Sequence, residues 1–151
     1  MDATITTSVG YVGGVMALAL SAIGSGLGIG VAGMAAVGAW KKCFAHNKAA
    51  PFIMAVFIGA PITQTFYGMI VMNKLLEMAK TGAALYPSLL AWGFFGGLAI
   101  GISAFIQGKI AACASDALAE TGQGFTNYLI ALGIIESVAI FVMAFIVVFA
   151  K

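Results

Sequence analysis

The sequence Ala131-Leu-Gly-Ile-Ile-Glu136-Ser-Val-Ala-Ile-Phe141 places one carboxylate inside a run that is otherwise largely apolar from residue 128 to residue 150. A helix of about 20 apolar residues spans the hydrocarbon core of a membrane, and Glu136 lies near the centre of such a window. A bare carboxylate there costs about 3 kcal/mol or more. Glu136 must therefore be protonated, paired or bound to a cation, unless it only holds two helices together.

The composition is that of an integral membrane protein. Of 151 residues, 62% are hydrophobic and 8% are charged, which leaves too few polar side chains for the surface of a soluble domain. The net charge of +2 is too small to indicate a nucleic-acid partner, and the chain contains no arginine. We therefore expect one membrane domain over residues 1–151.

Apolar segments at about 9–40, 51–73, 87–113 and 125–150 are each long enough to cross a membrane. They lack the alternating pattern of a barrel, and an open sheet edge cannot be satisfied in lipid. Pro51 and Pro87 stand where the second and third helices should start. The prediction is an all-α membrane protein of four transmembrane helices, with linkers at 41–48, 73–86 and 116–123.

The distribution of lysines predicts the orientation in the membrane. An even number of spans puts both termini on one side, and the linker at 41–48 carries three lysines. By the positive-inside rule this linker is cytoplasmic, so the linker at 116–123 is cytoplasmic too and both termini lie outside. The linker at 73–86 also carries Lys74 and Lys80, which weakens the asymmetry.

The two halves of the chain repeat. Gly26-Leu-Gly-Ile-Gly30 aligns with Gly97-Leu-Ala-Ile-Gly101, and the second segment aligns with the fourth so that Ile62 matches Glu136. We interpret the chain as two fused helical hairpins, 9–73 and 87–150, of which only the second keeps the carboxylate. The repeat is parallel rather than inverted.

The first and third segments are rich in glycine, which predicts close packing of their backbones. Residues four apart share one face of a helix, and glycines on that face let a neighbouring helix approach. The glycines with this spacing are Gly26 and Gly30 in the first segment and Gly93, Gly97 and Gly101 in the third.

The second segment offers polar partners for Glu136. Thr63, Gln64 and Tyr67 recur at helical spacing and form one polar stripe, and Gln107 adds an amide from the third segment. Pro61 cannot donate a hydrogen bond to the preceding turn, so it bends the helix and can free a carbonyl oxygen.

Glu136, Thr63, Gln64, Gln107 and a freed carbonyl together make a set of oxygen ligands suited to a hard cation. One carboxylate neutralises a monovalent cation but not a divalent one, which favours Na⁺ or H⁺. A proton needs only a carboxyl group and one acceptor, so the amides favour Na⁺. The alternative to a cation site is that these polar groups only form hydrogen bonds with one another between helices.

With these residues in view, the chain resembles the rotor-ring proteolipid of V-type ATPases, the K or c subunit, in its bacterial Na⁺-translocating form. The resemblance covers nearly the whole chain and rests on the doubled hairpin, the glycine-rich segments, Pro61-x-Thr63-Gln64-x-x-Tyr67, Gln107-Gly108-Lys109 and Glu136. It implies that Na⁺ is bound by Glu136, Gln64, Thr63, Gln107 and the backbone oxygen of Ala60, and that Tyr67 hydrogen-bonds the carboxylate. Ala60 and Ile62 depart from the family pattern, in which a larger apolar residue and a glycine are expected.

The resemblance also implies a mechanism and partners. Many copies would close into a homo-oligomeric ring in the cell membrane, in contact with lipid, with the first and third helices inside. A stator subunit of the a or I type would release the ion through an arginine, and a central-stalk subunit would meet the cytoplasmic loops. The chain itself would catalyse nothing, since it has no phosphate-binding loop and no candidate catalytic cluster.

Two other functions remain open from the sequence. The same rotor could be coupled to H⁺, with its amides serving only as hydrogen-bond partners. A small ion channel or secondary transporter would instead place Glu136 on a water-filled path. The parallel repeat argues against the transporter, because many transporters have inverted repeats.

Overall fold

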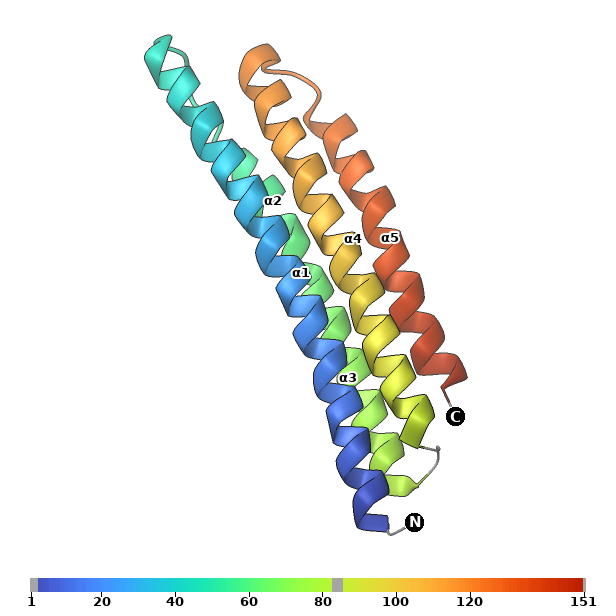
Figure 1. Ribbon diagram of the computed structural model, residues 1–151. Helices are drawn as coiled ribbons and strands as arrows, with labels where there is room; N and C mark the ends of the chain where they lie inside the picture. The colour runs from blue at the N-terminus through green and yellow to red at the C-terminus, as the bar shows by residue number, and fades with distance from the viewer. Residues whose placement is uncertain (1–2, 83–85, 151) are drawn as a thin grey trace.

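The computed structural model describes residues 3–82 and 86–150, and every regular element in them is helical. The elements in chain order are α1 (Ala3–Ala45), α2 (Met54–Gly59), the short 3₁₀ helix η1 (Ala60–Ile62), α3 (Thr63–Thr81), α4 (Tyr86–Thr121) and α5 (Phe125–Phe149) (Figure 1).

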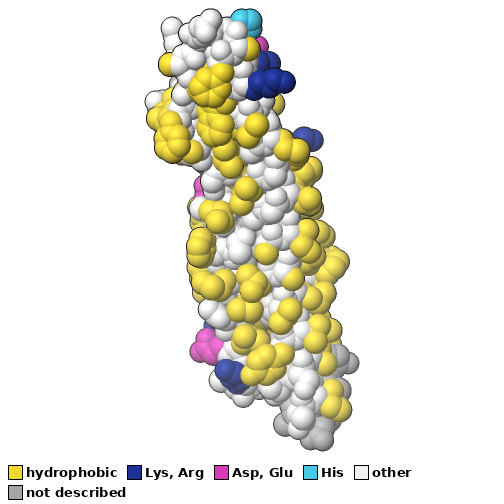
Figure 2. All heavy atoms as spheres, turned by 90° about the vertical axis from the view of Figure 1, so that its left-hand side faces the viewer, with side chains coloured by type: hydrophobic (Ala, Val, Ile, Leu, Met, Phe, Trp, Pro, Cys, Tyr) yellow, Lys and Arg dark blue, Asp and Glu magenta, His cyan; other side chains and the backbone are white. Residues whose placement is uncertain are grey.

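Four stretches of the described residues are long and apolar enough to cross a membrane, as the sequence predicts. They are Thr7–Ala45, Met54–Thr81, Pro87–Thr121 and Phe125–Phe149, so that α2, η1 and α3 together make one span. Figure 2 shows hydrophobic side chains over the middle of one face and most of the visible charged groups near its two ends. The predicted all-α fold with four apolar helices is confirmed.

The helices are longer than their apolar segments, so the predicted linkers are too wide. α1 continues to Ala45, α3 to Thr81 and α4 to Thr121, which turns much of the 41–48, 73–86 and 116–123 stretches into helix. Residues 83–85 of the second linker lie outside the described residues. Hydropathy marks only the part of a helix that suits lipid, whereas backbone hydrogen bonding continues past that boundary until a residue such as Gly82 ends it with φ of 67°.

The second span is interrupted at Pro61, as expected from the missing backbone donor. The α-helical pattern stops at Gly59, a single 3₁₀ turn covers Ala60–Ile62, and the α-helix resumes at Thr63. In this turn the Thr63 N–H donates to the Ala60 oxygen. Because its hydrogen bonds join residues three apart, the 3₁₀ turn orients its carbonyl groups differently from those of an α-helix. This change occurs at the level of the polar stripe.

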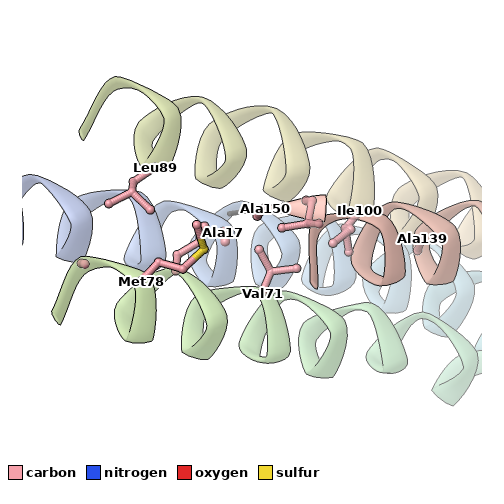
Figure 3. Packing of buried hydrophobic residues seen from close by; sticks show 10 residues of the cluster. Ala17, Val71, Met78, Leu89, Ile100, Ala139 and Ala150 are labelled. Atoms are coloured by element: carbon pink, nitrogen blue, oxygen red, sulfur yellow. The ribbon is translucent and has the colours of Figure 1, made fainter. Parts of the chain in front are cut away.

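α1 and α4 run in the same direction and pack side by side, α3 packs against both of them, and α5 packs against α3 and α4 (Figure 1). The described chain begins and ends toward the same end of the bundle. Ala17, Val71, Ile100 and Ala139 come from these four helices and meet in one buried apolar cluster (Figure 3). A second cluster near the two hairpin turns includes Ala36, Phe57, Ala111 and Leu132.

Glycines bring the α1 and α4 backbones together, but the set in α1 differs from the predicted one. A Cβ atom added at Gly24 would collide with the backbone of Gly101, and one added at Gly97 would lie 2.9 Å from the backbone of Ala17. Gly26 and Gly30 face open space, with nothing within 4 Å of an added Cβ. Within one chain, the prediction for these two glycines was wrong. The helix α1 contains two alternating sets of glycines spaced four residues apart, and the spacing alone does not say which set faces α4.

Two polar contacts lie near the hairpin turns, one within the first hairpin and one between the two hairpins. The Trp40 indole donates to the Pro51 carbonyl at 3.0 Å, which fixes the first turn against α1. Lys42 forms an exposed ion pair with Asp116 at 2.8 Å, linking the ends of α1 and α4. These contacts lie at the end of the bundle that is opposite the chain termini.

Gly97→Leu should destabilise the protein, because the new side chain must displace the backbone of α1 at Ala17. We expect a loss of about 1–3 kcal/mol or more, as for other overpacked cores. Thermal unfolding in detergent, followed by circular dichroism, measures it. Gly38→Leu is the matched control, since an added Cβ at Gly38 meets nothing within 4 Å. Equal stability of the two variants would show that the α1–α4 contact is not tight.

Candidate ion-binding site

Gln64, Gln107 and Glu136 lie in a polar layer between the two apolar clusters of the bundle. In the second span, Gln64 of α3 stands between Phe57 of α2, which belongs to one cluster, and Val71 of α3, which belongs to the other. On α5, Glu136 stands between Leu132 and Ala139 in the same way. Apolar side chains therefore pack above and below the layer along the bundle axis. The polar groups of the layer must find their hydrogen-bond partners within the protein.

Both oxygens of the Glu136 carboxylate accept hydrogen bonds. The Tyr67 hydroxyl donates to Oε1 at 2.8 Å, and the Gln107 amide nitrogen donates to Oε2 at 3.3 Å. These donors come from α3 and α4, so the acid of α5 is held from two neighbouring helices. The predicted contact between Tyr67 and the carboxylate is present in the structure.

Two fully buried amides extend this network inward. Gln64 Nε2 donates to Gln107 Oε1 at 2.8 Å, and Gln107 Nε2 also donates to the Leu132 carbonyl oxygen at 3.0 Å. Both amide side chains have 0% exposed surface, whereas Glu136 is half-buried. The carboxylate thus lies at the outer edge of the network, and the amides form its interior.

Thr63 connects the network to the interrupted turn of the second span. Its hydroxyl lies 3.1 Å from the Ala60 oxygen and 3.1 Å from Gln64 Oε1, with geometry for donating to either. Three oxygen atoms from one short stretch, those of Ala60, Thr63 and Gln64, therefore lie together. Within the 3₁₀ turn beside Pro61, the Ala60 oxygen also accepts from the Thr63 N–H.

Every residue that the sequence singled out for the site belongs to this one connected network. Its oxygen atoms are of the kind that hard cations prefer, and it contains one formal negative charge. Gln107 presents its amide nitrogen, not its oxygen, to Glu136 in this arrangement. Among the described residues, no group of three or more His, Cys, Asp or Glu side chains is placed to hold a metal ion.

Sequence reasoning missed two backbone acceptors on α5, one that belongs to the network and one that lies beside it. The Leu132 oxygen accepts from Gln107, and the Ile135 oxygen accepts from the Ser103 hydroxyl at 2.9 Å. Ser103 lies four residues before Gln107, on the same face of α4. That spacing of two polar residues in an apolar helix was a signal that could have identified Ser103. Leu132 gives no such signal, because only its backbone takes part.

Comparison with known proteins finds two similarities. Residues 90–149, which include Gln107 and Glu136, match the family model that describes the C subunit of ATP synthase. The chain is also 34% identical over 132 residues to the A-type ATP synthase subunit K of Methanocaldococcus jannaschii. Residues 90–149 are thus similar to C subunits of ATP synthase, and most of the chain is similar to a subunit K. Its four long apolar helices and this similarity indicate a membrane protein.

The similarity to the archaeal subunit K extends over 87% of this chain and 57% of the relative. The chain therefore spans little more than half the length of that relative. Of the network, Gln107 and Glu136 lie within residues 90–149, whereas Thr63, Gln64 and Tyr67 lie in the preceding hairpin, outside the match to the family model.

Gln107→Leu should destabilise the protein, because it leaves Gln64 Nε2 without its acceptor and removes two further hydrogen bonds. An unpaired buried polar group costs about 1–3 kcal/mol. Thermal unfolding in detergent provides the measurement. Gln123→Leu, an identical change at an exposed residue, should leave the midpoint nearly unchanged. A Gln107 variant as stable as the Gln123 variant would mean that the network does not hold the helices together.

Proposed function

We propose that this protein is a rotor subunit of an A/V-type ATPase and carries Na⁺ across the membrane on Glu136. One observation carries the proposal: the acid in the middle of the apolar bundle lies half-buried at the edge of a buried network of amide, hydroxyl and carbonyl groups. An acid so placed is expected to be functional. The similarity to ATP synthase subunits C and K suggests the rotary context.

The shape of the bundle suits assembly into a ring. Glycines bring the backbones of α1 and α4 close together, so this helix pair takes up little width, and α3 and α5 lie beside it. Phe141, Phe145 and Phe149 follow one another along α5 and are all more than half exposed. A unit that is narrow at α1 and α4 and wide at α3 and α5 closes into a ring with the narrow pair inside.

The chemistry of the network supports a monovalent cation. Glu136 supplies one negative charge, and Thr63, Gln64 and the Ala60 oxygen supply neutral oxygens. Na⁺ would be held by these four groups, and Gln107 would join them after its carboxamide turns to present oxygen. Tyr67 would keep its hydrogen bond to the carboxylate. Two buried amides are more than a proton requires, which favours Na⁺ over H⁺.

Transport follows from the cost of charge in hydrocarbon. With its cation bound, the site is neutral and can face lipid, whereas the bare carboxylate cannot. Rotation would carry loaded sites through the membrane. A stator subunit with an arginine would displace the ion at one place on the ring and allow another to enter. The half-buried position of Glu136 gives such a partner access from the outer side of the bundle.

The remaining roles in the complex follow from the same proposal. The hairpin turns near Lys42 and Asp116 would be cytoplasmic and would meet the central stalk, with the termini on the outer side of the cell membrane. The chain would be a non-catalytic subunit, and ATP hydrolysis or synthesis would take place in another part of the complex.

Glu136→Gln should abolish ion transport and leave the ring assembled, because an amide has the size of the acid but cannot take up a cation by charge neutralisation. Uptake of ²²Na⁺ by the reconstituted complex measures transport, and native mass spectrometry measures assembly. Glu77→Gln, the same change at a position near the end of α3, serves as the control. Normal uptake by the Glu136 variant would refute its role as the carrier.

Na⁺ should slow the labelling of Glu136 by a carbodiimide at fixed pH, because the reagent competes with the cation for the carboxyl group. Thr63→Ala should raise the half-protective Na⁺ concentration about tenfold or more, as expected for loss of a group that holds the ion. Thr65→Ala, two residues along and on the opposite side of α3, should leave it unchanged.

This experiment also separates Na⁺ from H⁺ coupling. In the absence of Na⁺, Thr63→Ala should leave the pH dependence of labelling as it is in the unaltered protein. Labelling that responds to pH but not to Na⁺ would indicate that the rotor carries H⁺. The small transporter is tested by imaging the solubilised particle, since a closed ring of many copies excludes it.

A further inference from the structure

The register between α1 and α3 can be read from two close contacts. A Cβ atom added at Gly68 of α3 would lie 2.5 Å from the Ser21 hydroxyl of α1. One added at Gly28 of α1 would lie 3.1 Å from the Pro61 side chain. A step of seven residues forward along α1 is matched by seven residues back along the second span, as two antiparallel helices require.

This register places Ser25 opposite Gln64. Ser25 is four residues after the first contact on α1, and Gln64 is four residues before its partner on α3. Both side chains are buried, with 2% of Ser25 and 0% of Gln64 exposed. Ser25 also lies between Ala17 and Ala32, which belong to the two apolar clusters, so it shares the polar layer.

The Ser25 hydroxyl differs from other buried serine hydroxyls in the long helices. Ser21 donates to the Ala17 oxygen at 2.8 Å, and Ser115 donates to the Ala111 oxygen at 3.0 Å, each one turn back along its own helix. Ser25 makes no such bond, and its oxygen has no hydrogen-bond partner among the described residues. A buried polar atom of this kind requires a partner from outside the chain.

Gln64 has hydrogen-bonding capacity to offer. Its oxygen accepts from Thr63, and its nitrogen donates to Gln107, which uses one of the two amide hydrogens. The second hydrogen has no acceptor among the residues that the structure describes. A buried donor and a buried hydroxyl therefore lie at the same level on two adjacent helices, and no direct hydrogen bond joins them.

We propose that one buried water molecule bridges the Ser25 hydroxyl and the second N–H of Gln64, so that Ser25 is a positioning residue for the ion site. The water accepts from Gln64 and donates to the Ser25 oxygen, and such bridges are nearly as favourable as direct hydrogen bonds. With its nitrogen held on the side of α1 and Gln107, Gln64 keeps its oxygen turned toward Thr63. The functional part of this inference rests on the proposed cation site.

The bridge can be tested by magic-angle-spinning NMR of the assembled protein labelled with ¹⁵N-glutamine. The chain contains only Gln64, Gln107 and Gln123, so the side-chain amide signals are few and can be assigned by substitution. Ser25→Ala should shift the Gln64 amide and leave Gln123 unchanged. Ser21→Ala, one turn earlier on α1, should leave Gln64 in place. A Gln64 signal that is unaffected by Ser25→Ala would overturn the proposal.

A second measurement tests the effect on the ion. Ser25→Ala should raise the Na⁺ concentration that half-protects Glu136 from the carbodiimide about tenfold, in the range found for groups that orient ligands. The effect should vanish in a Gln64→Ala background, because Ser25 acts through Gln64. Ser21→Ala should have no effect. An unchanged value for Ser25→Ala, or an equal effect with and without Gln64, would overturn the positioning role.

The two experiments distinguish failure of this inference from failure of the proposed function. If Na⁺ gives the unaltered protein no protection, the sodium assignment is wrong, and the NMR result alone decides whether Ser25 holds Gln64. If Na⁺ protects the unaltered protein and the Ser25 variant equally, the sodium site stands and Ser25 has no part in it.

Discussion

The structure depends on the cost of keeping the Glu136 carboxylate within an apolar bundle. A charge at the centre of a membrane costs about 3 kcal/mol or more, so the acid must be surrounded by groups that compensate it. Tyr67 and Gln107 donate to its two oxygens, and Gln64 in turn holds Gln107. Each of these polar residues stands in a helix that is otherwise apolar, and each forms a hydrogen bond within the network around this acid.

The second constraint is the close approach of α1 and α4. Glycine at positions such as Gly24, Gly97 and Gly101 removes the side chains that would separate the two backbones. The polar layer lies beside this tight pair, on the side where α3 and α5 meet. Close packing fixes the helices, and the fixed helices hold the side chains of the layer within hydrogen-bonding distance.

The helices and the grouping of the polar side chains around Glu136 could be predicted from the sequence because both depend on local patterns. Thr63, Gln64 and Tyr67 share a helical face, and a lone acid in a span needs such partners. The face of α1 that packs against α4 could not be predicted. Gly24 and Gly26 each begin a set of glycines spaced four residues apart, and only the packing of the helices decides which set makes the contact. The ends of the helices were missed because the thickness of the lipid layer determines where the apolar residues stop, whereas the backbone hydrogen bonds of the helix continue beyond that point. Ser25 was missed because nothing in its neighbourhood reveals the register with α3.

The central claim is that a cation neutralises Glu136 and can exchange there. The most direct test is a high-resolution structure of the assembled protein in Na⁺, compared with one in which Na⁺ is replaced by a large organic cation. The account predicts a density peak coordinated by oxygens of Glu136, Thr63, Gln64 and Ala60 that disappears on replacement, with the Gln107 oxygen turned toward it. The same hydrogen-bonded network without such a peak in both conditions would contradict the account.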